Sequence, residues 1–422
     1  MKAVLIFDPQ TGGHHPGYLL NLLRYVALHE MEVMLQILVA PDFPEKHGDV
    51  VAFAQERLPE RVKWWTLNSY EVEAYEETES PARRGLLEWH MLQRHGNRIP
   101  HDEIFLMYAD FITMPLALGR PFTAPLGGIL FRQTPHYQRV FKSRLNLSEQ
   151  TRSVIKGALL RRALTHPQLR MLLSLDSYLP DYLKHCRGGH KLGLCPDPVQ
   201  QATGASPPSL AEAAFPPEAK VLLCFGVISA RKGFGNFLEA SSRMSGEDLA
   251  RIAFWVVGPS REPGEESRVR SALEKIRAKG GYTFREDRFV SDAEIGPYFQ
   301  CAHGAAMPYQ KHLGMSAVLV RAAVANIPAL AADYGLLGHL VDDQRLGVSF
   351  DPANPAAIAS ALRDFAHGKV AFDKASAAKL AEINRMEPFG EALMRATGVL
   401  KKGDTLPFNP RAELAANPQT SG

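Results

Sequence analysis

The sequence predicts an α/β protein of two domains, each built on a parallel sheet with helices on both faces. Its 422 residues are too many for one ordinary hydrophobic core, so two domains are the default. Short apolar runs alternate with helical patterns in both halves of the chain, which is typical of βαβ units. The segment 196–217 interrupts this alternation. It is rich in Pro, Ala, Ser and Gln, which is typical of a domain linker.

In the first half, the apolar runs are short enough for buried strands, and the helical patterns between them repeat with a longer period. The expected strands are Lys2–Phe7, Val33–Ala40, Val62–Leu67, Glu103–Tyr108, Gly128–Arg132 and Met171–Leu175. The expected helices are Gly17–His29, Leu86–His95 and Thr151–Thr165.

The second half restarts the alternation after the linker. The expected strands are Lys220–Phe225, Ile252–Val257, Tyr282–Arg285, Gly304–Met307, Pro328–Ala332 and Val348–Phe350. The expected helices are Gly235–Ser242, Glu265–Lys279, Asp292–Cys301, Ala317–Ala325, Pro355–Phe365, Ala377–Ile383 and Met386–Val399. Asn354 is placed to cap the helix that begins with Pro355. We expect domains at 1–198 and 199–385, and a disordered polar tail at 401–422.

Composition excludes several classes of function. The formal net charge of +3 is nearly neutral for this length, so it gives no reason to expect nucleic acid. No apolar run reaches about 18 residues, so we expect no transmembrane helix, and Asp8 follows the first apolar run too soon for a signal peptide. The four cysteines form no CxxC pair, which favours reduced thiols in a cytoplasmic protein. The histidines show no metal-binding spacing, so we expect no metal site.

The most informative segment is 307–333. It combines a strand end, a loop with Gly314, a helix and a second apolar strand. The backbone N–H groups of Gly314, Met315 and Ser316 would lie at the helix N-terminus, where anions and above all phosphate bind. His312 precedes this loop and is a candidate contact for a sugar or phosphate. The segment suggests a nucleotide-diphosphate pocket.

Two further loops follow strands. Gly12 and Gly13, with His14 and His15, come after the first strand, where ligands of open α/β sheets bind. A tight turn with surface histidines is the plainer interpretation. In the second half, Arg231 and Lys232 precede Gly233 and a helix. Cations there oppose the helix dipole, so a bound anion would explain them, although a solvated helix start is also open.

Four segments in order resemble the GT-B glycosyltransferases of the large retaining family often called family 4. The matching residues are Gly12 and Gly13; Gly226, Lys232 and Gly233; Gly258 followed by the segment 288–292; and the unit 308–332 followed by Gly335, Asp342 and Asp343. The matches span most of the C-terminal half and the first twenty residues.

The resemblance implies two Rossmann-like domains facing each other across a cleft, with the helix at 386–400 returning to the first. It implies a hexosyltransferase-like enzyme, of the kind used in polysaccharide biosynthesis, that retains anomeric configuration. The donor would be a UDP- or GDP-sugar, with no other cofactor. No DxD motif for a metal is found. The implied catalytic residues are Lys232, Arg231, Asp110 and His136. The implied donor-binding residues are Gly226, Gly233, Val290, His312, Gly314, Met315, Ser316 and Arg321. The implied acceptor- or sugar-binding residues are Gly12, Gly13, His14 and His15.

The roles of three of these side chains have alternative interpretations. A helix N-cap is an equal alternative for Asp110. A lone histidine, His136 included, is more often structural. The family usually carries two glutamates where Leu313 and Arg321 stand here, and Arg321 could instead meet a phosphate or an acid. These departures keep two alternatives open: a non-catalytic nucleotide-sugar-binding protein on the same scaffold, or a sugar-nucleotide epimerase.

The segment 151–165 predicts an amphipathic helix with a basic face. The common interpretation is a helix whose apolar face, including Val154 and Ile155, packs on the core. The other is peripheral contact with an anionic membrane, at its inner face. In that case the acceptor would be a lipid or lipid-linked sugar rather than a free carbohydrate or small molecule.

Overall fold

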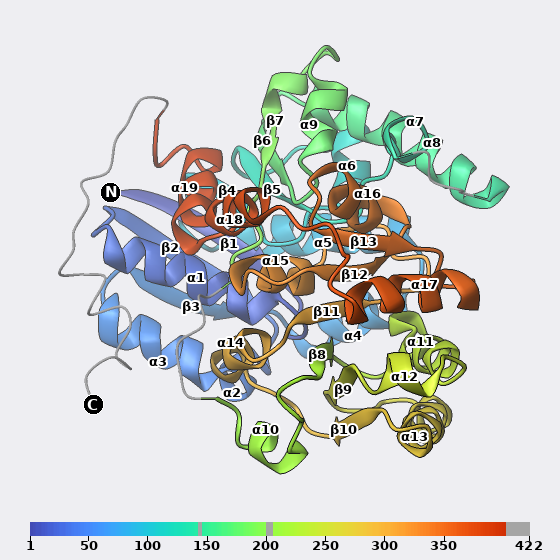
Figure 1. Cartoon of the computed structure of the whole chain (residues 1–422). Coiled ribbons are helices and arrows are strands. Elements are labelled where there is room, and N and C mark those ends of the chain that lie inside the picture. Colours follow the sequence, from blue (N-terminus) through green and yellow to red (C-terminus); the bar gives the residue numbers. More distant parts are fainter. Residues whose placement is uncertain (142–145, 200–205, 402–422) are drawn as a thin grey trace. The chain divides into compact units, whose positions relative to one another are not determined.

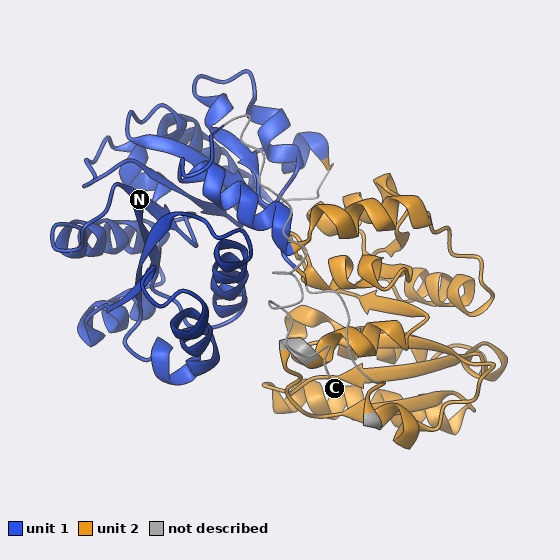
Figure 2. Ribbon diagram, turned by 90° about the vertical axis from the view of Figure 1, so that its left-hand side faces the viewer, with its two compact units in different colours: residues 1–140, 145–198, 386–422 blue, residues 141–144, 199–385 orange. Residues whose placement is uncertain are grey.

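The computed structural model describes residues 1–141, 146–199 and 206–401 (Figure 1). Its internal contacts divide the chain into two compact units (Figure 2). Unit 1 comprises residues 1–140, 145–198 and the chain from Met386 onward, and unit 2 comprises chiefly residues 199–385. The tail predicted at 401–422 lies outside the described residues from position 402 onward.

Unit 1 is built on a parallel sheet, seven-stranded in its described part, in the order β3-β2-β1-β4-β5-β6-β7. The strands are β1 (Lys2–Asp8), β2 (Val33–Val39), β3 (Val62–Thr66), β4 (Glu103–Leu106), β5 (Leu126–Leu130), β6 (Leu169–Ser174) and β7 (Leu192–Leu194). The strand order reverses between β1 and β4. Open α/β sheets bind ligands beyond the carboxyl ends of the strands at such a reversal.

Helices cover both faces of this sheet. They are α1 (His15–Leu28), α2 (Phe43–Lys46), α3 (Gly48–Arg57), α4 (Ser69–Glu77), α5 (Pro81–Gly96), α6 (Thr113–Ala117), α7 (Tyr137–Val140), α8 (Leu147–Leu164), α9 (Tyr178–Leu183) and α19 (Met386–Ala396). One core joins the sheet to α1, α3 and α19, and the other joins it to α4, α5, α6, α8 and α9. Phe389 of α19 packs against Tyr18 of α1, with ring centroids 5.1 Å apart.

Unit 2 repeats the same plan with the strand order β10-β9-β8-β11-β12-β13, again all parallel. The strands are β8 (Lys220–Phe225), β9 (Ile252–Val257), β10 (Tyr282–Glu286), β11 (Gly304–Met307), β12 (Ala329–Ala332) and β13 (Gly347–Phe350). The helices are α10 (Pro208–Ala213), α11 (Phe234–Ser241), α12 (Gly246–Leu249), α13 (Pro263–Ala278), α14 (Asp292–Gln300), α15 (Ala317–Val324), α16 (Gly335–Asp343), α17 (Pro355–Ala366) and α18 (Lys374–Ile383). The order reverses between β8 and β11.

The predicted α/β class with two parallel sheets is confirmed. Asn354 caps α17 as predicted, because its side chain accepts hydrogen bonds from the N–H groups of Ala356 and Ala357. The segment predicted as a linker, 196–217, contains the short helix α10. The helix at 151–165 packs on the core, as the common interpretation expected, but not through the predicted face. Val154 and Ile155 are exposed, and the face of α8 that packs on the core carries Ser153, Gly157, Leu160, Ala163 and Leu164.

Candidate functional site

The loops after β8 and β11 interlock at the strand reversal of unit 2. The backbone N–H of Gln310 donates a hydrogen bond of 2.8 Å to the carbonyl oxygen of Arg231. Gly233 lies between the two loops with a φ of +71°, and a Cβ there would come within 2.1 Å of the carbonyl oxygen of Pro308. Only glycine fits this approach. The residues on both loops are therefore held in fixed positions relative to one another.

Lys232 is the cation that this arrangement places over the end of β8. Its Nζ donates a hydrogen bond of 2.9 Å to the hydroxyl of Tyr309 and lies 4.1 Å from the centroid of the Tyr309 ring. A Cβ built on Gly226 would lie 3.4 Å from that Nζ, so the ammonium stands beside the bare backbone of Gly226. Lys232 is half-buried, whereas Arg231 is exposed. Among the described residues, the ammonium of Lys232 therefore contacts a hydroxyl and an aromatic ring and forms no ion pair with an acidic side chain.

The loop from His312 to Ser316 lies next to Tyr309. The rings of Tyr309 and His312 meet edge to face at 5.3 Å, and Nε2 of His312 lies 3.1 Å from the carbonyl oxygen of Met315. Gly314 and Met315 are half-buried, and Ser316 is buried at the N-cap of α15. Within the described part of the chain, the N–H groups of residues 314–316 donate no hydrogen bond. Amides of this kind at a helix start suit an anion.

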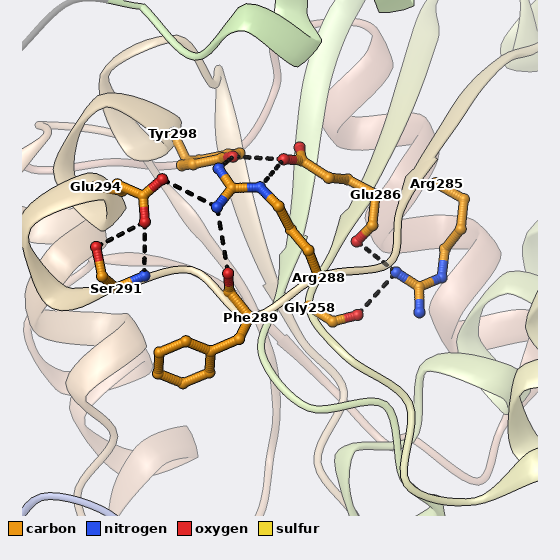
Figure 3. Close-up of polar contacts among 8 residues, drawn as sticks. All are labelled: Gly258, Arg285, Glu286, Arg288, Phe289, Ser291, Glu294 and Tyr298. Atoms are coloured by element: carbon orange, nitrogen blue, oxygen red, sulfur yellow. Dashed lines mark hydrogen bonds and ion pairs between the residues drawn. The ribbon is translucent and has the colours of Figure 1, made fainter. Parts of the chain in front are cut away.

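A third loop follows β10 and is held by one arginine (Figure 3). The guanidinium of Arg288 donates to Glu286 at 2.8 Å, to Glu294 at 2.9 Å and to the hydroxyl of Tyr298 at 2.8 Å. The hydroxyl and N–H of Ser291 lower the pKa of Glu294 to about 2, so this partner stays charged. This network fixes the backbone of the loop, on which Phe289 and Val290 come directly after Arg288.

The predicted role of Val290 in donor binding stays a prediction. Val290 is only 5% exposed, so its side chain packs inward and only its backbone could meet a donor. Its neighbour Phe289 is 76% exposed, and its ring points away from the polar network (Figure 3). The sequence drew attention to this segment but not to the aromatic ring.

In unit 1, the loop after β1 sits on an Asp–His pair. Asp8 is fully buried at the end of β1, and its Oδ1 lies 2.7 Å from Nδ1 of the buried His15. Burial raises the pKa of Asp8, and the charge and hydrogen bond of His15 oppose the rise. His14 is more exposed and stacks on His15 and Phe131, with ring centroids 4.4 and 4.3 Å apart. Gly12 and Gly13 beside them are exposed.

Asp110 holds the loop after β5. Its carboxylate accepts hydrogen bonds from the N–H groups of Phe131 at 2.8 Å and Arg132 at 3.0 Å, and from Nε2 of Gln133 at 3.0 Å. Burial raises the pKa of Asp110, and these hydrogen bonds oppose the rise. The N-cap alternative is wrong, because α6 begins at Thr113 with Ile112 at its N-cap. Asp110 fixes the backbone under Phe131 and so acts as a positioning residue.

His136 is not a surface residue. It is fully buried, and its Nε2 lies 2.8 Å from Oδ2 of Asp176. The rings of Tyr137 and Tyr182 pack against it at 4.8 and 5.7 Å. A fully buried imidazole does not face a substrate, which argues against the predicted catalytic role of His136. A sequence offers no signal that separates such a histidine from a ligand-binding one.

The structure thus brings together two groups of predicted residues, each within its own unit. In unit 2 they are Gly226, Lys232, Gly233, His312, Gly314, Met315 and Ser316, joined by Tyr309, which the sequence did not single out. In unit 1 they are Gly12, Gly13, His14, His15 and Asp110 around Phe131. Arg321 lies half-buried within α15, after its first turn.

Other classes of site find little support in the described part of the structure. The described residues contain no group of three or more His, Cys, Asp or Glu side chains arranged to hold a metal ion. No helix among them is both long and apolar enough to cross a bilayer. All four cysteines are described and are free thiols.

Comparison with known proteins agrees with this architecture. Residues 219–367, within unit 2, match the family model of Glycosyl transferases group 1. No curated protein matches the chain.

The structures that resemble this one cover nearly the whole chain. Sucrose-phosphate synthase from Thermosynechococcus elongatus has a TM-score of 0.64 at 14% identity, and the match covers 94% of this chain and 98% of that one. Trehalose-6-phosphate from E. coli, bound with UDP-2-fluoro glucose, has a TM-score of 0.62 at 11% identity, covering 95% and 100%. Anabaena HepE, in complex with UDP and glucose, has a TM-score of 0.56 at 13% identity, covering 95% and 100%.

These matches confirm the GT-B fold that the resemblance implied. The match of residues 219–367 to Glycosyl transferases group 1 confirms the predicted class of enzyme, a glycosyltransferase.

Proposed function

We propose that the protein transfers a sugar from a nucleotide-diphosphate donor, of the UDP or GDP type, to a carbohydrate, lipid-linked or small-molecule acceptor. The observation that carries this proposal is the group formed by Lys232, Tyr309 and the loop 312–316 at the strand reversal of unit 2. It combines a positive charge with N–H groups that have no partner within the described chain. Both favour a diphosphate.

The proposed mechanism is stabilisation of the leaving group. When the bond between the sugar and the diphosphate breaks, negative charge grows on the phosphate oxygen that leaves. The ammonium of Lys232 and the N–H groups of residues 314–316 would stabilise that charge, with Arg231 adding a more distant positive charge. The loops interlock through Gly233 and Gln310. The ammonium and the N–H groups are therefore already in place before the nucleotide sugar binds.

Two other residues extend the proposed donor site. His312 would contact the sugar or the diphosphate, since its ring stands between Tyr309 and Met315. The exposed ring of Phe289 and the backbone of Val290 would lie against the nucleoside, because both follow the carboxyl end of β10. Arg321, which stands where the family usually has a glutamate, would meet a phosphate of the donor or pair with an acid.

On the acceptor side we propose the loop of unit 1 with Gly12, Gly13, His14 and His15. The exposed glycines leave the backbone open, and the stacked His14 and Phe131 offer a flat ring surface of the kind on which a sugar packs. Desolvation of the ring stacked between His15 and Phe131, with the neighbouring positive charges of His15 and Arg132, lowers the pKa of His14, so its imidazole would be neutral and able to accept a hydrogen bond from a hydroxyl.

The stereochemical outcome and the location are also proposals. We infer retention of anomeric configuration from the resemblance to retaining enzymes and from the family of the matched domain. We infer a cytoplasmic location, supported by the four free cysteines. Lys232 and the loop amides would allow leaving-group stabilisation without a metal ion.

The test is product analysis. The purified protein is incubated with radiolabelled UDP- and GDP-sugars and a panel of acceptors, with Lys232→Ala in parallel. The proposal expects labelled glycoside or donor hydrolysis by the native protein and a loss of both by the variant. Tight nucleotide binding with neither product would favour the non-catalytic binding protein, the alternative that Leu313 and Arg321 motivate. Conversion of one nucleotide sugar into another would identify an epimerase.

A further inference from the structure

Helix α8 has two apolar faces, and only one of them packs on unit 1. The packed face carries Ser153, Gly157, Leu160, Ala163 and Leu164. On the opposite side, Leu147, Val154 and Ile155 are 81%, 69% and 54% exposed. At about 100° per residue, these three side chains fall within roughly 100° of one another around the helix axis. We call Leu147, Val154, Ile155 and the exposed Ala158 between them the α8 stripe.

The fold of unit 1 does not account for this stripe. A helix on the surface of a globular domain usually turns polar side chains to solvent. Single exposed apolar residues are normal, but several gathered on one helix mark an interaction surface. Figure 1 draws α8 in teal at the margin of unit 1.

The charges of the sequence segment that contains the stripe are mostly positive. The segment 131–165 contains eight basic residues and one acid, whereas the whole chain has a formal net charge of only +3. The basic residues are Arg132, Arg139, Lys142, Arg144, Arg152, Lys156, Arg161 and Arg162, and the acid is Glu149. Because Glu149 accepts the N–H of Asn146 in the capping box of α8, its charge is engaged at the helix start.

Four of the arginines are exposed, namely Arg132, Arg139, Arg152 and Arg162. The other two described basic residues are held by the protein. Nζ of Lys156 donates to the carbonyl oxygen of Arg132 at 3.2 Å, and Arg161 lies over the ring of Tyr182 at 5.9 Å. The helix therefore carries exposed apolar side chains together with exposed positive charges on and near it.

We propose that the α8 stripe and the exposed arginines around it dock unit 1 on an anionic lipid surface. The stripe would lie at the boundary between headgroups and acyl chains, and the arginines would contact the lipid phosphates. A second copy of this chain fits the surface less well, because two faces of the same positive charge repel each other. Nucleic acid would use the arginines but not the aliphatic stripe.

This inference does not rest on the proposed function, because docking is measurable without any donor. Vesicles of pure phosphatidylcholine are compared with vesicles of equal parts phosphatidylcholine and phosphatidylglycerol in a co-sedimentation assay on the full chain. We expect at least tenfold stronger partitioning onto the anionic vesicles, and a decrease as salt is raised.

Two sets of variants separate the apolar and charged contributions. The triple variant L147S/V154S/I155S should weaken partitioning at least tenfold. Arg152→Ala and Arg162→Ala should each weaken it about fivefold and reduce its dependence on salt. Lys275→Ala is the matched control, because it removes an exposed charge from α13 of unit 2 and should leave partitioning nearly unchanged. All the replaced residues are exposed, so the melting temperature should stay within a few degrees of the native value.

Three results would overturn the proposal. The first is equal binding of the native protein to neutral and anionic vesicles, or no binding to either. The second is a folded triple variant that binds anionic vesicles as the native protein does. The third is a sedimentation-velocity measurement in which the native protein is a dimer and the triple variant a monomer, which would assign the stripe to a second copy of the chain.

Discussion

The two strand reversals of this molecule have the same topology and opposite chemistry. In unit 2, the loops after β8 and β11 present the ammonium of Lys232 and backbone N–H groups that have no partner among the described residues. In unit 1, the loop after β1 presents imidazole rings above the buried carboxyl of Asp8. Parallel sheets of this kind fix where a ligand binds, and the loop residues fix which ligand it is. The first loop suits an anion and the second suits hydroxyl groups.

The two regions also differ in how deeply their charged side chains are buried. Lys232 is half-buried and keeps its charge near solvent, whereas unit 1 encloses several acids. Glu88 of α5 is fully buried, and the hydroxyl of Tyr75 donates a hydrogen bond of 2.9 Å to its Oε1. Burial raises the pKa of Glu88 well above its ordinary value, and the nearby charges of Asp110 and Asp8 add to the rise.

The largest expected effect is that of Lys232→Ala on turnover. Removal of one preorganised donor at a leaving group typically costs about 10²–10³ in kcat. Because Lys232 lies on a turn and is only half-buried, the melting temperature should change little. Steady-state kinetics with the preferred nucleotide sugar measures the effect. Arg231→Ala is the control, because this exposed neighbour should cost tenfold at most. Full turnover by a folded Lys232→Ala would remove the proposed role of unit 2.

A pair of glycine substitutions compares the two loops as structures. Gly233→Ala should destabilise unit 2 by at least about 2 kcal/mol, since its Cβ would lie 2.1 Å from the Pro308 oxygen at a positive φ. Gly13→Ala meets no atom within 4 Å, so only the strain of its φ of +67° remains, about 1 kcal/mol. Urea unfolding measures both. Equal costs would mean that the interlocking of the unit 2 loops is unimportant for stability.

Glu88→Gln tests the burial of acids in unit 1 through the pH dependence of the free energy of unfolding. Because the native pKa of Glu88 lies above the unfolded value, the native state binds an extra proton between the two values. The free energy of unfolding of the native protein therefore falls as pH rises above about 4.5, by up to about 1.4 kcal/mol per unit from this group. The variant lacks this slope, so its stability relative to the native protein should rise with pH. A constant difference between pH 5 and 8 would show that Glu88 ionises normally.

The smallest effect is expected for Tyr309→Phe. This change removes the hydroxyl that accepts the Lys232 hydrogen bond but keeps the ring against which the ammonium lies. The loss of one hydrogen bond is worth about 1 kcal/mol, or about fivefold in kcat/KM. A loss as large as that of Lys232→Ala would mean that the hydroxyl itself contacts the donor.

The sequence predicted most strands of both sheets to within a few residues, because buried parallel strands are short apolar runs bounded by turn residues. It predicted Lys232 and the loop 314–316 from local order alone, and both lie beside the same reversal. Burial was harder to predict. His136 and Val290 lie inside, whereas Val154 and Ile155 lie outside.

These differences share a physical cause. A residue pattern gives the faces of a helix or strand, but which face is covered depends on elements far away in the sequence. Tyr309 shows the same limit, since its contact with Lys232 joins loops 77 positions apart. The carboxylate of Asp110 accepts a hydrogen bond from the N–H of Phe131, 21 positions further along the chain, and no local motif predicts this contact.

The account depends most on diphosphate binding at the Lys232 loop, and isothermal titration of UDP and GDP into the native protein and Lys232→Ala tests it directly. We expect one of the two nucleotides to bind the native protein, and the folded variant to bind it at least tenfold more weakly. Equal affinity of the two proteins for that nucleotide, or no binding of either nucleotide to the native protein, would contradict the account.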